Sequence, residues 1–272
     1  MSSDVGEWST AIAEVRHDDV LIRGYRLTEL IGTISYIDSV FLVHTGELPT
    51  SGQRRVLDAI YVSLIEHGIS PTTIIARTLA SCGTPMQASL SGALLSIADW
   101  HGGSGEQLGA VLADLVSLSE NDNDLAARTA ELVSVYRAQR RRFEGFGHPQ
   151  HPDADPRASQ LFAVADEAGV SGRHVAAARM LEAEIERSSG RRLALNVTGA
   201  IAALLLDLGF SWMAIRGMVI AARASGLVAH VVEEREQGGT WRHVPGDRVT
   251  YTGAPDRRLR PDPDGVSETD SD

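Results

Sequence analysis

Apolar residues recur every three to four positions through most of the chain, which is the period of an amphipathic helix. Residues 53–67 place Val56, Ile60 and Leu64 on one stripe, and residues 121–142 repeat the pattern. The same period predicts further helices over residues 28–45, 73–81, 89–100, 173–188, 199–208 and 211–236, and one that ends at 167–169. Alternation with a period of two is scarce and predicts only a short hairpin or arm in residues 241–252. The pattern therefore predicts an all-α fold.

Composition narrows the possible chemistry. All 25 basic residues are arginine, so no mechanism that needs a lysine amine is available. With 36 acidic residues the net charge is −11, which argues against binding of nucleic acid. The single cysteine, Cys82, excludes a disulfide framework and a multi-cysteine metal site.

The N-terminus and the longest apolar run indicate where in the cell we expect the protein. The N-terminus has no basic, apolar leader, and the apolar run of residues 199–206 is far shorter than the ~20 residues that span a membrane. We therefore expect a cytoplasmic protein that does not bind a membrane. Residues 256–272 mix Pro, Asp, Ser and Arg, and we expect them to be disordered.

Candidate chemistry lies where the helical pattern breaks. The breaks are residues 66–72, 99–105, 145–157 and 195–199, which are rich in glycine and proline and carry histidines and an arginine. Loops with titratable residues on a helical scaffold are the usual place for a site.

Two of these breaks contain histidines that can be interpreted in different ways. His101 precedes two glycines and can either donate to a substrate oxygen or sit at a helix C-cap. His148 with Arg157 would suit a ligand with a carbonyl and a carboxylate, or both can be solvated in a proline-rich turn. A metal site formed by His148, His151, Asp153 and Asp155 has suitable residue types but no second cluster to complete it, so we expect no metal.

Taken in order, the broken segments resemble the citrate synthase superfamily, and most closely citryl-CoA lyases and the lyase portion of ATP-citrate lyase. The segments that carry the resemblance are Glu66-His67-Gly68, Ser89 through His101-Gly102-Gly103, Gly145-Phe-Gly-His148 with Asp155-Pro-Arg157, Leu195-Asn-Val-Thr-Gly, Arg223 to His230, and Arg242-His with Tyr251-Thr-Gly. The likeness runs from about Gly24 to Gly253.

The resemblance implies an all-helical fold with two domains and the site in the cleft between them. Residues 1–103 and 210–255 would form the large domain, and residues 104–209 the small one. It also implies a homodimer that binds a polycarboxylate or an acyl-CoA, with coenzyme A thioester as substrate.

The resemblance also implies roles for single residues. His101 would stabilise the enol of an acyl-CoA, and His148 would exchange a proton with the oxygen of a keto acid. The residues that would hold carboxylates are His67, Arg157, Arg223 and, from the other subunit, Arg242 or Arg248. An acidic protein that binds a polyanion needs such a local positive cluster.

The sequence departs from the family pattern at two places. Thr198 occupies the third catalytic position, where the family carries an aspartate, and a threonine hydroxyl cannot replace a carboxylate as general base. The residues after His148 are not basic, so Arg140–Arg142 or Arg191 and Arg192 would have to bind CoA phosphates, unless they form a solvated face.

Three functions stay open at this point. The first is an enzyme of citryl-CoA lyase type that breaks or forms a carbon–carbon bond. The second uses the same cleft for a decarboxylating or ring-opening reaction, in which no α-proton is removed. The third is a non-catalytic dimer that binds the ligand and regulates another process.

Overall fold

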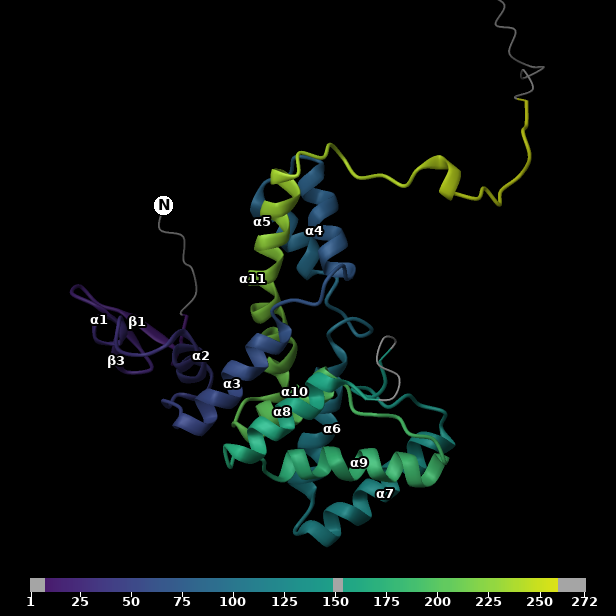
Figure 1. Cartoon of the computed structure of the whole chain (residues 1–272). Coiled ribbons are helices and arrows are strands. Elements are labelled where there is room, and N and C mark those ends of the chain that lie inside the picture. The colour runs from purple at the N-terminus through teal and green to yellow at the C-terminus, as the bar shows by residue number, and fades with distance from the viewer. Residues whose placement is uncertain (1–7, 149–153, 259–272) are drawn as a thin grey trace, which may run out of the picture.

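Helices make up most of the regular structure, a computed structural model that describes residues 8–148 and 154–258 (Figure 1). The all-α prediction is confirmed. The helices are α1 Leu27–Leu30, α2 Tyr36–Thr45, α3 Ser51–Leu64, α4 Pro71–Ser81, α5 Met86–Leu94, α6 Ser104–Leu118, α7 Asp122–Ala138, α8 Pro156–Glu167, α9 Arg173–Ser189, α10 Val197–Asp207 and α11 Ile215–Glu236, with short 3₁₀ turns η1 Trp212–Ala214 and η2 Gly246–Arg248.

Helix α10 lies at the centre of the body of the molecule, the group of helices in the lower half of Figure 1. Every residue from Ala200 to Leu206 is buried, because the helix is apolar on all sides. Helices α6, α8 and α9 pack around it, and α7 packs on α9. This arrangement surrounds the first turn of α10 with other elements.

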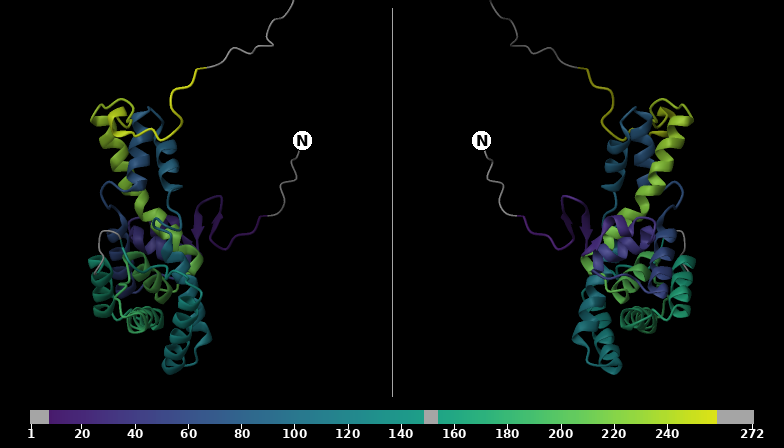
Figure 2. Two further views of the ribbon diagram at one scale, coloured as in Figure 1. Left: turned by 90° about the vertical axis from the view of Figure 1, so that its right-hand side faces the viewer. Right: turned by 90° about the vertical axis from the view of Figure 1, so that its left-hand side faces the viewer.

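Helix α11 connects this body to the opposite end of the molecule. It contacts α3, α6 and α10 in the body and packs farther along against α4 and α5 (Figures 1 and 2). Residues 212–236 are long and apolar enough to cross a membrane by length and composition alone, a test that core helices of globular proteins also pass. In this fold the helix carries buried Arg223 and Glu234 and packs against other helices.

Of the two alternatives predicted for residues 241–252, the hairpin is wrong. Residues 241–252 contain no strand and only the turn η2, because Pro245 interrupts the segment and the Arg242 backbone bonds to the Ser81 hydroxyl instead of to a strand. The strands lie near the N-terminus, where β1 Ala13–Val15, β2 Val20–Ile22 and β3 Tyr25–Arg26 form an antiparallel sheet. Strands of two or three residues are too short for a period of two to stand out.

Two predicted helices are also wrong in extent. The helix expected over 28–45 stops at Leu30 and restarts at Tyr36, where Ser35 and Asp38 form a capping box. The helix expected over 89–100 ends at Leu94, and the helix α6 that follows was not predicted. The division into two domains stays a prediction. Of the tail predicted to be disordered, residues 259–272 lie outside the described residues.

Candidate functional site

A cavity of about 490 Å³ lies where the segments that break the helical pattern meet. Its lining includes the predicted residues His67, His101, His148, Arg157, Thr198 and Arg223. They come from the turn after α3, the turn before α6, the loop before α8, the first turns of α8 and α10, and the middle of α11. The structure thus brings together six residues that are far apart in the sequence.

Two histidines lie close together in this cleft. The ring centroids of His67 and His148 are 5.8 Å apart, with the planes tilted by 31°. Because both rings line the cavity, a ligand there can meet both imidazoles.

His101 is held by a tight turn. The backbones of Ala98 and His101 exchange hydrogen bonds of 3.0 and 2.9 Å, and Gly103 donates to the same Ala98 carbonyl. Since α5 already ends at Leu94, His101 is not the C-cap of that helix. Burial lowers the pKa of His101, and the nearby charge of Arg223 lowers it further. The imidazole is therefore held neutral, with one N–H to donate.

Arg223 supplies a buried positive charge. Its side chain is 10% exposed, and its Nη1 atom lies 3.9 Å from a Glu66 carboxylate oxygen. This nitrogen has no hydrogen-bond partner among the described residues. Burial lowers the pKa of Arg223, as does the charge of Arg157, while Glu66 raises it. A buried guanidinium nitrogen without a partner is costly, and an anionic ligand would satisfy it.

Glu66 is held next to Arg223 by α11. His230 Nε2 lies 2.8 Å from a Glu66 oxygen. A Cβ at Gly226 would lie 2.0 Å from the Ile65 carbonyl oxygen, so only glycine allows this approach of α11 to residues 65–66. The contact fixes the segment that carries His67.

Asp155 ties Arg157 to α10. The Asp155 carboxylate accepts from Arg157 Nε at 3.0 Å and Nη2 at 2.9 Å, and from the Val197 backbone at 2.9 Å. Burial would raise the pKa of Asp155, but these hydrogen bonds outweigh it and hold the pKa below its usual range. Arg157 is therefore positioned by a buried, charged carboxylate.

Thr198 is fully engaged in hydrogen bonds. Its hydroxyl donates to Asn196 Oδ1 at 2.7 Å, and Ser104 Oγ lies 2.9 Å away on the other side. Asn196 also caps α10 by accepting from the Gly199 backbone. The hydroxyl proton is committed to Asn196, and Thr198 therefore offers no base.

The loop that carries His148 packs directly on this first turn of α10. Gly145 accepts from the Asn196 backbone at 3.0 Å, and Gly147 accepts from the Asn196 side chain at 3.0 Å. A Cβ at Gly199 would lie 2.4 Å from the Gly145 carbonyl oxygen, so a larger residue would push the loop away.

The remaining predicted site residues lie elsewhere. Arg242 is bonded to Glu234 of its own chain at 2.6 and 2.7 Å and does not line the cleft. Arg191 and Arg192 are exposed on the loop after α9, and Arg248 is exposed in η2. Their roles in binding CoA or in reaching a partner subunit stay predictions. The metal prediction involves His151 and Asp153, which lie outside the described residues.

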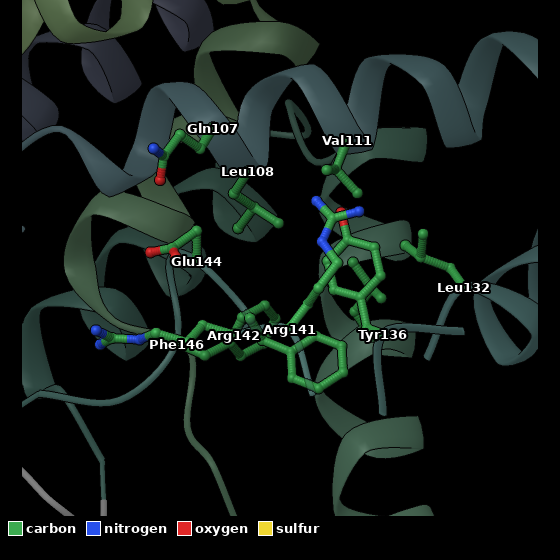
Figure 3. Close-up of a pocket in the computed structure, with 11 residues that line it drawn as sticks. Gln107, Leu108, Val111, Leu132, Tyr136, Arg141, Arg142, Glu144 and Phe146 are labelled. Atoms are coloured by element: carbon green, nitrogen blue, oxygen red, sulfur yellow. The ribbon is translucent and has the colours of Figure 1, made fainter. Parts of the chain in front are cut away.

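A second cavity of about 360 Å³ adjoins the cleft between α6, α7 and α9 (Figure 3). Arg142, Glu144 and Phe146 line both cavities. The Arg141 guanidinium lies 4.0 Å over the Tyr136 ring. Leu108, Val111, Leu132 and Leu181 add apolar walls. A long ligand with a polar head and an apolar arm could extend from one cavity into the other.

Sequence reasoning missed several residues that support the site. The missed residues are Glu66, Ser104, Glu144, Asp155 as a partner of Arg157, and His230 as a partner of Glu66. Asn196 before an apolar run and Asp155 before a proline are both N-cap signals and could have been found.

The comparisons with known proteins agree with this geometry. The model of the citrate synthase C-terminal domain family matches residues 51–243. The citrate/2-methylcitrate synthase of Bacillus subtilis is 28% identical over 81% of this chain and 57% of its own length. The citrate synthase of Heyndrickxia coagulans is 28% identical over 84% of this chain and 58% of its own length. The chain thus spans little more than half the length of these curated relatives.

Solved structures show the same fold over nearly the whole chain. The citryl-CoA lyase of Hydrogenobacter thermophilus has a TM-score of 0.85 and 34% identity, covering 93% of this chain and 97% of its own. The ATP citrate lyase of Methanothrix soehngenii, solved with citrate and coenzyme A, has a TM-score of 0.76 and 18% identity, covering 93% of this chain and 43% of its own.

Proposed function

The chain belongs to the citrate synthase family, and from this we propose that it breaks or forms a carbon–carbon bond in a citryl-CoA-type hydroxyacyl thioester. The similarity to a citryl-CoA lyase along almost the full length of both chains supports this substrate class. We place the reaction in the cleft that holds His101, His148 and Arg223.

The buried Arg223 nitrogen, which has no hydrogen-bond partner among the described residues, carries the proposal. A carboxylate in the cleft would accept from Nη1 of Arg223 and could also reach Arg157 and His67, which line the same space. A citryl group has several carboxylates and a hydroxyl, so it matches this set of cations and imidazoles.

Cleavage would then follow from the side chains present. His148 takes the hydroxyl proton, the bond between the carbinol carbon and the thioester α-carbon breaks, and the electron pair moves onto the thioester as an enolate. The neutral His101 donates a hydrogen bond to the enolate oxygen, and its lowered pKa keeps it in the donor form that carries no charge. The carboxylates of the released keto acid would still meet Arg223 and Arg157 in the cleft.

The second cavity supports the proposal that the thioester arm of the substrate binds next to the cleft. Coenzyme A is long, and Arg142 and Phe146 line both spaces. Arg141 and Arg142 would meet phosphates, and the apolar walls would meet the pantetheine chain. Arg191 and Arg192 are further candidates for the phosphates.

We also propose that the protein acts as a homodimer in the cytoplasm. Helices α4, α5 and α11 pack together, and exposed apolar residues occur on or just beyond them. These residues are Ile74, Leu95, Val228 and Val232. Exposed apolar residues of this kind often mark an interface, and a second copy would cover them.

Replacing Arg223 with methionine is expected to weaken citrate binding by about 10- to 100-fold, because a hydrogen bond to a charged group contributes about 1.5–3 kcal/mol. Calorimetric titration with citrate measures this change. Arg179→Met is the matched control, since Arg179 forms a surface ion pair with Asp166 outside the cleft. Equal citrate affinity in both variants would contradict the assignment of Arg223.

A further inference from the structure

The cleft lacks a free base or acid at Thr198, yet the proposed cleavage leaves an enolate that must take a proton at carbon. We propose that the Glu144 carboxyl group makes this proton transfer. The inference rests on the proposed function and deepens it, because it assigns a catalytic residue that the sequence did not indicate.

Among the described residues, Glu144 is the carboxylate of the cleft that has no hydrogen-bond or ion-pair partner. Among the described residues, the side chains that line the cleft include two carboxylates, Asp99 and Glu144. Asp99 is bonded to Arg216 at 2.7 Å. Glu144 forms no hydrogen bond or ion pair with any residue in the described ranges 8–148 and 154–258. A half-buried carboxylate without a partner is available to a ligand.

The other carboxylates around the cleft are committed to fixed partners. Glu66 lies 2.8 Å from His230 and next to Arg223. Asp155 accepts from Arg157 and from the α10 backbone. Removing either from its partners would leave a buried charge unpaired, which is costly. Neither is free to move a proton to and from substrate.

The backbone places Glu144 beside the position of Thr198. Gly145, the next residue, accepts from the Asn196 backbone, and a Cβ at Gly145 would lie 3.2 Å from the Gly199 Cα. Glu144 precedes Gly145 in the chain, and Thr198 precedes Gly199. Because consecutive Cα atoms are about 3.8 Å apart, both residues lie next to this contact. A glutamate side chain is long enough to extend into the space that a carboxylate at position 198 would occupy.

The side-chain direction agrees with this role. In Figure 3, α6 passes from Gln107 to Val111, and the Glu144 oxygens turn toward the Gln107 end. Ser104, which holds Thr198, lies one turn before Gln107 at the start of the same helix. The positive N-terminal end of this 15-residue helix favours a carboxylate there.

The proton balance closes without a further reactant. His148 removes the hydroxyl proton as the carbon–carbon bond breaks, and this proton passes through solvent to the Glu144 carboxylate. Glu144 then delivers the proton to the enolate carbon, so both groups return to their starting states. The products are a keto acid and an acetyl thioester. In the condensation direction Glu144 removes the α-proton.

The test compares Glu144→Gln with Glu131→Gln, a control at an exposed carboxylate on α7 outside both cavities. We expect Glu144→Gln to lower kcat for citryl-CoA cleavage by about 100-fold and to slow exchange of acetyl-CoA methyl protons with D₂O equally, with KM changed less than about threefold. Adding Thr198→Asp to Glu144→Gln is expected to raise kcat at least about tenfold above that of Glu144→Gln alone. Thermal melting checks that each variant is folded.

Each other outcome overturns the inference. If wild type cleaves citryl-CoA and Glu144→Gln matches the control in kcat and exchange, Glu144 does not transfer the proton. If activity falls, KM rises by the same factor and Thr198→Asp restores no activity, then Glu144 binds the substrate and does not transfer the proton. If wild type itself neither cleaves nor exchanges, the proposed function has failed and the role of Glu144 fails with it.

Discussion

Replacing His148 with alanine is expected to lower kcat for citryl-CoA cleavage by about 10²- to 10⁴-fold, the usual contribution of a positioned general base. His148 lines the cleft beside His67, on a loop that is anchored to the first turn of α10 by Asn196. Since that anchor uses the backbone of Gly147, the substitution removes the imidazole and keeps the loop in place.

The control for this variant is His17→Ala, at an exposed position in the turn between β1 and β2. Steady-state release of acetyl-CoA measures both variants, and citrate binding shows whether the cleft is intact. Equal turnover by His148→Ala and His17→Ala would show that His148 does not act on the hydroxyl.

Asparagine at position 155 is expected to destabilise the fold by about 3–5 kcal/mol, because it breaks a buried ion pair and leaves Arg157 uncompensated. The Asp155 side chain is 1% exposed and accepts from Arg157 and from the Val197 backbone. Asparagine has nearly the same size as aspartate and can still cap α8. The decrease in the free energy of unfolding therefore reports the removal of the charge. Urea unfolding at pH 7 measures the free energy difference.

The same carboxylate gives a pH dependence with a defined sign. Its folded pKa is lowered, so it contributes stability above its unfolded pKa of about 3.9, and that contribution is lost as the pH falls through the folded value. Asp155→Asn should therefore lose less stability than wild type on going from pH 5 to acid. The exposed Asp114→Asn is the control and should stay within about 0.5 kcal/mol of wild type. An equally small effect at Asp155 would contradict the role of the ion pair.

Much of the helical framework could be predicted from the sequence, because long helices with one buried face keep the apolar period. Helices α3, α4, α7, α9 and α11 follow that period closely. The site could also be located, since turns rich in glycine and proline interrupt the same period. Residues from the four interrupted segments meet in one cavity.

Other features depend on contacts that a sequence does not display. The N-terminal strands are too short to show their alternation, and α6 begins at a glycine without a capping side chain. The pairing of Glu66 with His230 depends on the close crossing of α11 at Gly226. Glu144 differs from the neighbouring carboxylates only in having no hydrogen-bond or ion-pair partner in ranges 8–148 and 154–258, which a sequence does not show.

Citryl-CoA turnover by the purified wild-type protein, with acetyl-CoA and oxaloacetate followed together, tests most simply whether the cleft cleaves this thioester. We expect both products to appear in equal amounts, and His148→Ala to release them about 10²- to 10⁴-fold more slowly. Citrate binding without any product would contradict it and favour a ligand-binding dimer. Turnover by Thr198→Asp alone would also contradict it, and would indicate that the natural cleft serves a decarboxylating or ring-opening reaction.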